Sequence, residues 1–331
     1  MKTKIIAEVG SVHDGSFGNA LRLIELAKQS GADYVKFQMH IAHAETTKHA
    51  KSPNYFNEEN RFDYFKRTGF TEKQWSKIIK YTKKKKIDFM CSVFSKEAIN
   101  KLIKLNIKNI KIPSGELNNL IMLNYLKNKK LNIFLSTGMS NFHEIDKAIN
   151  ILKNEKIILM QCTSIYPCPP SKVGLNIIDE FKKKYKNIDI GFSDHTLTPT
   201  ASILSISKGV SYIEKHITFS KKMYGSDAKF AMEPLEFYFY CKYIKEGYLI
   251  NKSKFDKNNM KNFYNTKNIF EKRIVASKNI KKGKILTLKD LKFKKNNNGI
   301  KVSDYKLILK KKLKKNILKD IGFKRTDFVK I

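Results

Sequence analysis

Two histidines stand in short segments that mix apolar and polar residues, His195 in "GFSDHT" and His216 in "EKHITF". Neutral imidazole is a common ligand of zinc, manganese and iron. If the two segments end neighbouring strands, both rings can hold one divalent metal, and water, carboxylate or substrate would fill the other positions. Asp194 and Glu214 flank the pair, and we expect them to orient the rings. The alternative is that both rings only fill a core.

Two lysines lie in segments typical of buried strands, Lys36 in "VKFQ" and Lys111 in "KIPSGE". Burying an ammonium group without a counter-anion is costly, so something negative should bind beside them. Ser92, Ser136 and Ser193 stand at the ends of three further β-rich segments. Because their hydroxyl groups can donate to a phosphate or a carboxylate, the pattern predicts a site for an anionic substrate.

The two lysines also admit other interpretations. Glu8, Glu116 or Glu214 could balance their charges within the protein, as a structural network. Either lysine could instead form a Schiff base with a carbonyl substrate, as in barrel aldolases.

The remaining histidines have weaker contexts. His13 lies in "GSVHDG", in the loop after the first β-rich segment, where it could bind a ligand or stabilise the turn. For His40, His43, His49 and His143 we predict surface positions, because no strand-end motif surrounds them.

The elements that must position these residues are short β-branched runs that alternate with segments of helical period. The predicted strands are Ile5–Val9, Tyr34–Gln38, Ile87–Ser92, Ile107–Ile112, Asn132–Ser136, Ile157–Gln161, Ile188–Ser193 and Tyr212–His216. Between them lie predicted helices such as "FGNALRLIELAKQS" and "TEKQWSKIIKYTKKK", the second capped by Thr71. With a closing helix over Leu235–Ile250, the pattern indicates an α/β protein whose main part is a (β/α)8 TIM barrel.

Polar residues gather at one end of this predicted barrel. Strand one carries Glu8, and the following strands end in "KFQ", "CSVFS", "KIPSGE", "STGM", "QCTSIYP", "FSDHT" and "EKH". Barrel enzymes build their active sites at the carboxyl ends of the strands. The distribution therefore predicts an active site at that face.

Composition bounds the class of protein. The chain has 331 residues, of which 41% are hydrophobic and 29% charged, so it can bury a large core. Its formal charge of +36 comes almost entirely from lysine, and arginine, the usual reader of base edges, is scarce. We therefore expect a lysine-coated surface and no nucleic-acid partner, although a lysine-rich binding protein that only retains a barrel is the non-enzymatic alternative.

Localisation follows from what the sequence lacks. It has no apolar run approaching a membrane span, and "MKTKIIAEVG" does not resemble a signal peptide. The four cysteines include no CxxC pair, and we expect them to be reduced. These features predict a cytoplasmic protein with no membrane partner.

The strand-end motifs resemble a known family. "AEVGSVHDG", "VKFQ", "KIPSGELNN", "LSTGM", "CTSIYP", "GFSDHT" and "EKHITF", in this order, are similar to those of the sialic acid (N-acetylneuraminate) synthase family. The resemblance implies a transferase that condenses phosphoenolpyruvate with N-acetylmannosamine or a 2,4-diacetamido-6-deoxy hexose. The product would be a sialic or legionaminic acid, and "PSGE" favours these branches over pseudaminate. Another phosphoenolpyruvate-dependent aldose synthase is the alternative within this fold.

The resemblance also implies roles for matching positions. Phosphoenolpyruvate would be held by Lys36, Lys111, Ser92, Ser114, Ser136 and Ser193. The sugar would face Gln38, Glu116, Tyr166 and Asp227, with Glu8 beside the reacting carbons. His195 and His216 would hold a divalent metal, Mn2+ or Mg2+.

Three positions depart from the family pattern. Val12 stands where many relatives have Asn, and Ser164 in "CTSIYP" stands where relatives often carry Asn. In the C-terminal part, Lys295 in "KKNNNGI" stands where many relatives have an arginine that reaches the sugar of the partner subunit. A lysine retains the charge but lacks the planar fork of arginine. We expect Ser164 and Lys295 to contact the substrate.

Beyond the barrel, "ASKNIKKGKILTLKDL" looks like the start of the small antifreeze-like (SAF) domain of this family. The predicted domains are the barrel over residues 1–250, a linker over 251–270 and the SAF domain over 271–331. The resemblance implies a domain-swapped homodimer in which each small domain caps the partner's barrel.

Overall fold

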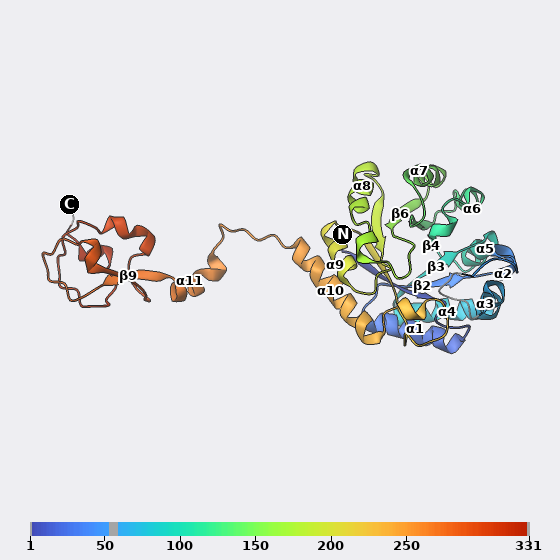
Figure 1. Ribbon diagram of the computed structural model, residues 1–331, viewed down its shortest axis with the longest axis horizontal. Coiled ribbons are helices and arrows are strands. Elements are labelled where there is room, and N and C mark those ends of the chain that lie inside the picture. The colour runs from blue at the N-terminus through green and yellow to red at the C-terminus, as the bar shows by residue number, and fades with distance from the viewer. Residues whose placement is uncertain (1, 53–58, 330–331) are drawn as a thin grey trace. The chain divides into compact units, whose positions relative to one another are not determined.

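The computed structural model describes residues 2–52 and 59–329, and its main feature is a closed barrel of eight parallel strands in sequential order (Figure 1). The strands are β1 Lys4–Gly10, β2 Tyr34–Met39, β3 Asp88–Val93, β4 Asn109–Ile112, β5 Asn132–Ser136, β6 Lys156–Gln161, β7 Asp189–Ser193 and β8 Tyr212–His216. The predicted TIM barrel is confirmed, and β5 and β8 have the predicted bounds.

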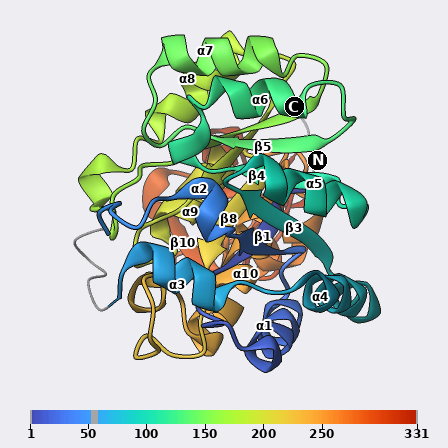
Figure 2. The ribbon, with the colours of Figure 1, turned by 90° about the vertical axis from the view of Figure 1, so that its right-hand side faces the viewer.

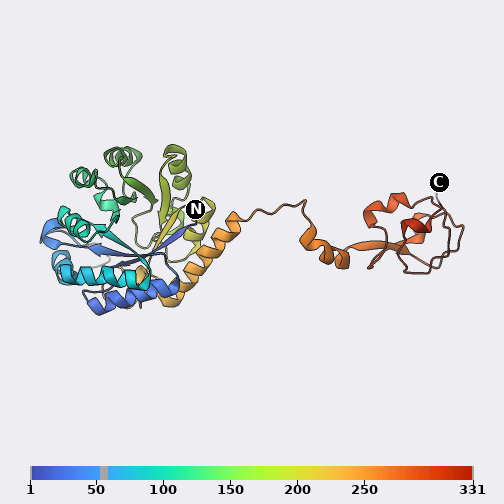
Figure 3. The same cartoon turned by 180° about the vertical axis from the view of Figure 1, so that it is seen from behind.

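Helices surround the strands (Figure 2). They are α1 Phe17–Ser30, α2 Ala42–Glu45, α3 Arg61–Thr68, α4 Glu72–Lys85, α5 Lys96–Lys104, α6 Leu120–Leu126, α7 Phe142–Ile151, α8 Asn176–Lys184, α9 Thr200–Ser207 and α10 Pro234–Lys252. Thr71 caps α4 and shares a capping box with Gln74, which satisfies two free amides of the first turn. The closing helix α10 packs against α1 and α9 (Figure 3).

The inside of the barrel has two layers. Side chains alternate between the two faces of a strand, so every second residue points inward. An apolar cluster fills the lower layer and consists of Ile6, Met90, Phe134, Ile158, Met160 and Tyr212, with Tyr34 packed against it. Two residues further along their strands, Glu8, Lys36 and Glu214 follow Ile6, Tyr34 and Tyr212. The alternation thus places ionisable groups directly above an apolar floor.

The chain divides into two compact units, Met1–Ser253 and Lys254–Ile331. The second contains α11 Tyr264–Phe270 and an antiparallel pair, β9 Lys272–Ala276 and β10 Leu291–Lys295. Its own apolar cluster includes Ile274, Ile317 and Phe323. Each unit therefore has a separate core, while the SAF assignment of the second stays a prediction. Among residues 2–52 and 59–329, no helix is long and apolar enough to cross a membrane.

Candidate active site at the barrel mouth

A cavity that is open to solvent lies at the carboxyl ends of the strands. Its walls bring together most of the residues that the sequence singles out, namely Glu8, Lys36, Gln38, Ser92, Lys111, Ser114, Ser136, Tyr166, Ser193, His195, His216 and Asp227. These residues come from all eight strands or the loops that follow them. A concave site with convergent polar groups is the usual form of a small-molecule site.

Glu214 joins the two buried lysines at the base of this cavity. Its Oε1 lies 2.9 Å from Lys36 Nζ and its Oε2 lies 2.9 Å from Lys111 Nζ. Ser193 Oγ donates to the same Oε1 at 2.9 Å. A second carboxylate, Glu8, lies 3.4 Å from Lys36 Nζ. The internal network that the sequence left open as an alternative is therefore present, and Glu214 is its centre.

The protonation equilibria of this cluster are strongly shifted. Burial alone would raise the pKa of Glu214, but Lys111 and Lys36 outweigh it and hold that pKa well below its usual range. Burial lowers the pKa of Lys111 despite the attraction of Glu214. For Lys36, the attraction of Glu214 and Glu8 exceeds the effect of burial, and its pKa is raised. Burial raises the pKa of Glu8. The Lys36 and Glu214 charges thus stabilise each other, while Lys111 lacks a full counter-charge.

Gln38 connects this cluster to a buried histidine. Its Nε2 donates to Glu8 Oε1 at 2.7 Å, and its Oε1 lies 2.9 Å from His40 Nε2. The prediction that His40 lies at the surface is wrong, since its side chain is only 7% exposed and lines the cavity. By contrast, His43, His49 and His143 are exposed, as predicted.

The two histidines of the predicted metal pair lie close together, with ring centroids 6.2 Å apart. His195 Nδ1 donates to the carbonyl oxygen of Thr163 at 2.8 Å, which leaves Nε2 toward Tyr166 OH at 3.0 Å. Burial, followed by the proximity of His216, lowers the pKa of His195 to about 4, so the ring is neutral. The buried Nδ1 of His216 has no hydrogen-bond partner among the described residues. The neutral ring of His195, beside a ring of His216 whose Nδ1 has no hydrogen-bond partner among the described residues, is suited to bind a cation.

The part of the chain that the structure describes offers the two rings no third protein ligand. Within residues 2–52 and 59–329, no group of three or more His, Cys, Asp or Glu side chains could hold a metal ion. A metal bound by His195 and His216 would therefore take its other ligands from water or substrate, as catalytic metals do.

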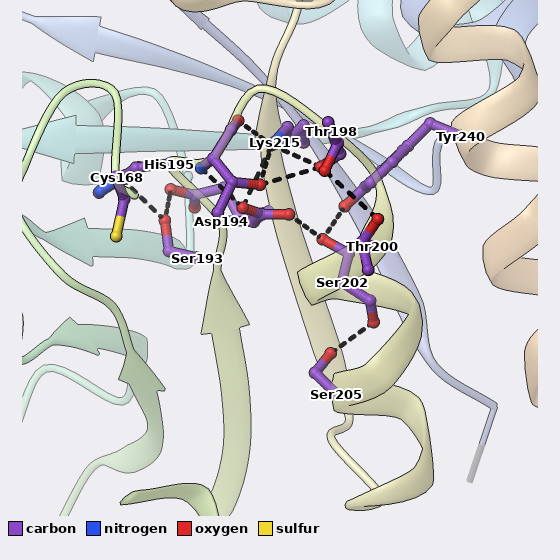
Figure 4. A network of polar contacts seen from close by, with 12 residues as sticks. Cys168, Ser193, Asp194, His195, Thr198, Thr200, Ser202, Ser205, Lys215 and Tyr240 are labelled. Carbon is purple, nitrogen blue, oxygen red and sulfur yellow. Dashed lines mark hydrogen bonds and ion pairs between the residues drawn. The ribbon is translucent and has the colours of Figure 1, made fainter. Parts of the chain in front are cut away.

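The carboxylates beside the histidines do not orient them. Asp194 pairs with Lys215 at 3.2 Å and accepts hydrogen bonds from Thr196 N at 2.8 Å and Ser202 Oγ at 2.6 Å (Figure 4). Neither Asp194 nor Glu214 hydrogen-bonds to an imidazole in the described part of the chain, so that expectation is wrong. The physical reason is that both carboxylates already neutralise buried lysines.

The first βα loop closes one side of the cavity. Asp227 Oδ2 accepts a hydrogen bond from Ser11 N at 2.9 Å, and Gly10 has a φ of +55° beside it. A Cβ at Gly10 would lie 2.3 Å from Asp227 Oδ2, so only glycine fits. His13 stabilises the turn, since its Nδ1 accepts from Gly15 N at 3.1 Å and burial lowers its pKa to about 4.

Two predicted substrate residues of the barrel, Glu116 and Ser164, do not line this cavity. Glu116 is half-buried and accepts a hydrogen bond from Asn119 Nδ2 at 2.8 Å. Ser164 N donates to Gly138 O at 3.4 Å. Lys295 belongs to the second unit, where its ammonium lies 5.0 Å from the centre of the Phe270 ring.

Two groups that matter here had only weak signals in the sequence. Glu214 is two residues before His216, and its inward direction follows from strand alternation. His40 stands two residues after Gln38, so the same alternation would have placed it on the inward side. His40 lies just beyond the predicted end of the strand at Gln38, so the alternation was not extended to it.

Comparison with known proteins agrees with the motifs. The family model described as "NeuB family" matches residues 23–254. The chain is 37% identical to an N,N'-diacetyllegionaminic acid synthase of Campylobacter jejuni, over 96% of this chain and 98% of that protein. It is 29% identical to a pseudaminic acid synthase of the same species, over 99% and 97% of the two chains.

A solved structure supports the same relation. The N-acetylneuraminic acid synthetase of Leptospira borgpetersenii, in complex with citrate, superposes with a TM-score of 0.70 at 26% identity. The match covers 82% of this chain and 93% of that one. The resemblance inferred from the strand-end motifs is confirmed, and the chain belongs to the NeuB family.

Proposed function

We propose that this protein condenses phosphoenolpyruvate with an N-acetylated hexose to give a nonulosonic acid and phosphate. The observation that carries the proposal is the buried Lys36–Glu214–Lys111 cluster at the barrel mouth, surrounded by serine hydroxyls. It supplies positive charge and donors for an anion above an apolar floor. The higher identity to the legionaminic than to the pseudaminic acid synthase favours a 2,4-diacetamido-6-deoxy hexose over the pseudaminate precursor, with N-acetylmannosamine as the other candidate.

The walls of the cavity suggest a division of roles. Phosphoenolpyruvate would bind Lys36, Lys111, Ser92, Ser114, Ser136 and Ser193, and the sugar would bind Gln38, Tyr166 and Asp227. Glu116, Ser164 and Lys295 stay proposed sugar contacts on the strength of the resemblance. Glu8, beside Lys36 and Gln38, would face the reacting carbons.

The reaction forms one C–C bond and breaks one C–O bond. C3 of phosphoenolpyruvate attacks the aldehyde carbon of the open-chain sugar, and the aldehyde oxygen becomes a hydroxyl group. Water adds at C2 and loses a proton, which balances the proton that the aldehyde oxygen takes up, and the resulting tetrahedral carbon expels phosphate together with the former bridging oxygen. Lys36 and Lys111 would stabilise the charge that develops on carboxylate and phosphate.

A divalent metal, Mn2+ or Mg2+, would be held by His195 and His216. When bound, such a cation acts as a Lewis acid toward a carbonyl oxygen. Thr163 fixes the ring of His195 through Nδ1.

A Schiff-base aldolase is the second candidate, because burial lowers the pKa of Lys111 and a neutral amine is nucleophilic. The ion pair of Lys111 with Glu214 opposes this chemistry, since it favours the ammonium form.

We propose that the protein acts in the cytoplasm as a domain-swapped homodimer whose second unit, an SAF domain, caps the partner's barrel. Neither nucleic acid nor membrane would be a partner.

One experiment tests the reaction and its rival together. The protein is incubated with Mn2+, a panel of 2-acetamido and 2,4-diacetamido hexoses, and phosphoenolpyruvate carrying 18O at the bridging position. We expect a nonulosonic acid by mass spectrometry and the 18O label in the released phosphate. Lys111→Gln should abolish turnover, whereas Lys108→Gln, at an exposed position near the same strand, should not. Borohydride trapping of pyruvate on Lys36 or Lys111, without phosphate release, would establish the aldolase instead.

A further inference from the structure

His40 lines the cavity and lies in an aromatic sandwich. Its ring centroid is 3.7 Å from that of Phe65, at an interplanar angle of 4°, and 4.2 Å from that of Phe94, at 22°. Stacking on both faces fixes the plane of the ring but leaves its two nitrogens free to bond at the edges. The ring can therefore act only through those edges.

Both edges are occupied. Nδ1 lies 2.6 Å from Glu45 Oε1, and the other oxygen of Glu45 accepts a hydrogen bond from Ile41 N at 3.1 Å. Nε2 lies 2.9 Å from Gln38 Oε1. Glu45 is almost as deeply buried as His40, with 5% of its side chain exposed. A buried carboxylate beside an imidazole holds the ring in one orientation.

The direction of these bonds follows from the orientation of the Gln38 amide. Its NH2 group, which only donates, faces Glu8 Oε1 at 2.7 Å. The amide oxygen of Gln38 then faces His40, which must donate from Nε2. Glu45 accepts from Nδ1 in the same way, so both ring nitrogens of His40 donate.

We propose that His40 and Glu45 form a positioning pair that fixes the amide of Gln38, and through it the carboxylate of Glu8, for the condensation. The inference rests on the proposed function and adds two positioning residues to it. Without a donor at His40, either end of the Gln38 amide could face Glu8, and an amide oxygen there could not donate a hydrogen bond to Glu8 Oε1. Glu8 would then lose its only hydrogen-bond donor other than Lys36 among the described residues.

The kinetic test compares variants with the full-length wild-type enzyme. We expect His40→Ala to lower kcat about 10- to 100-fold, the range typical of residues that orient a catalytic group, while KM for phosphoenolpyruvate stays within about twofold. Glu45→Gln retains an acceptor and should lose about 3- to 10-fold. Added imidazole should restore part of the activity of His40→Ala. His49→Ala, an exposed histidine in the same segment, serves as control.

The outcomes separate this inference from the proposed function. If wild-type protein turns over no sugar of the panel, the proposed function fails. If the wild type is active and folded His40→Ala matches it, or loses kcat without imidazole rescue, the positioning role is overturned.

A second measurement does not depend on turnover. In protein labelled with 15N-histidine, the signals that vanish in His40→Ala belong to His40. We expect both of its ring nitrogens to carry protons, with both N–H signals shifted by hydrogen bonding. One unprotonated ring nitrogen would contradict the proposed direction of the bonds.

Discussion

At the scale of single residues, the important feature of the site is that its buried ammonium groups have too few carboxylates to balance their charge. Glu214 is shared by Lys36 and Lys111, so one negative charge faces two ammonium groups. Glu8 adds a second carboxylate, but burial raises its pKa and favours its neutral form. The cluster therefore retains an unbalanced positive charge, which an anionic substrate would neutralise.

The proposed metal site gives a prediction at the same scale. We expect His195→Ala and His216→Ala to retain less than about one tenth of the Mn2+ bound by wild type after dialysis, because two imidazoles supply all the protein ligands. Activity should fall at least about 100-fold, since a Lewis acid contributes several kcal/mol to such a reaction. The melting temperature should stay within a few degrees of wild type.

Mass spectrometry measures the metal that each protein retains after dialysis, and calorimetric titration measures how tightly each protein binds Mn2+. His143→Ala, an exposed histidine on α7, is the matched control and should bind metal normally. Full activity of metal-stripped wild type would remove the metal from the mechanism.

At the scale of elements, a buried network ties the loop after β7 to two helices (Figure 4). Asp194 binds Lys215 on β8 and Ser202 on α9, and Ser202 Oγ in turn accepts from Tyr240 OH of α10 at 2.9 Å. Lys215 Nζ also donates to Thr196 O in the loop. Since His195 stands between Asp194 and Thr196, this network determines where its ring enters the cavity.

Asp194→Asn should destabilise the barrel strongly. The change leaves the buried ammonium of Lys215 without a counter-charge, and breaking a buried pair in this way costs about 3–5 kcal/mol of unfolding free energy. Tyr240→Phe removes one hydrogen bond and should cost only about 1 kcal/mol. Urea unfolding monitored by circular dichroism measures both values.

The control is Asp179→Asn, which removes an ion pair with Lys208 on the outer surface, where the Asp179 side chain is 57% exposed. Exposed pairs contribute about 0–1 kcal/mol, so this variant should unfold nearly as the wild type does. Equal losses for Asp194→Asn and Asp179→Asn would show that the buried pair has no special role.

At the scale of the whole molecule, the two units have separate apolar cores and different charge. Residues 271–331 contain 21 lysines and arginines but five acidic residues. If the second unit caps a barrel as proposed, its positive charge would attract the anionic substrate, an effect that salt weakens.

Deleting everything after Phe270 should leave a folded but inactive barrel. The barrel core draws on residues before 254 only, so its melting transition should persist. Activity should fall at least about 100-fold, because the proposed cap of the partner's cavity is lost. Calorimetry measures the melting transition, and phosphate release measures the activity.

Lys295→Ala gives a finer test of the same cap. It should raise KM for the sugar more than KM for phosphoenolpyruvate, whereas Lys289→Ala, exposed in the same unit, should change neither. A truncated barrel with wild-type turnover would show that the second unit has no part in the reaction.

The sequence alone determined the barrel and the face that carries the chemistry. Strand alternation and the common direction of parallel strands are local properties, so Lys36, Ser136 and His216 could be placed at the mouth from their positions in their own segments. The tertiary structure decided which of these groups pair. Lys111 and Glu214 are 103 residues apart, and only closure of the barrel brings them to 2.9 Å.

The same reason explains the errors over His40 and Asp194. Burial of His40 depends on Phe65 and Phe94, which come from α3 and the loop after β3. Asp194 faces Lys215 because β7 and β8 are neighbours in the barrel. The sequence predicts on which face of its strand a side chain lies, because side chains alternate along a strand. The partner that this side chain contacts depends on packing between distant segments. Only the folded chain therefore showed that Glu214 pairs with two lysines and that His40, expected at the surface, is buried in the lining of the site.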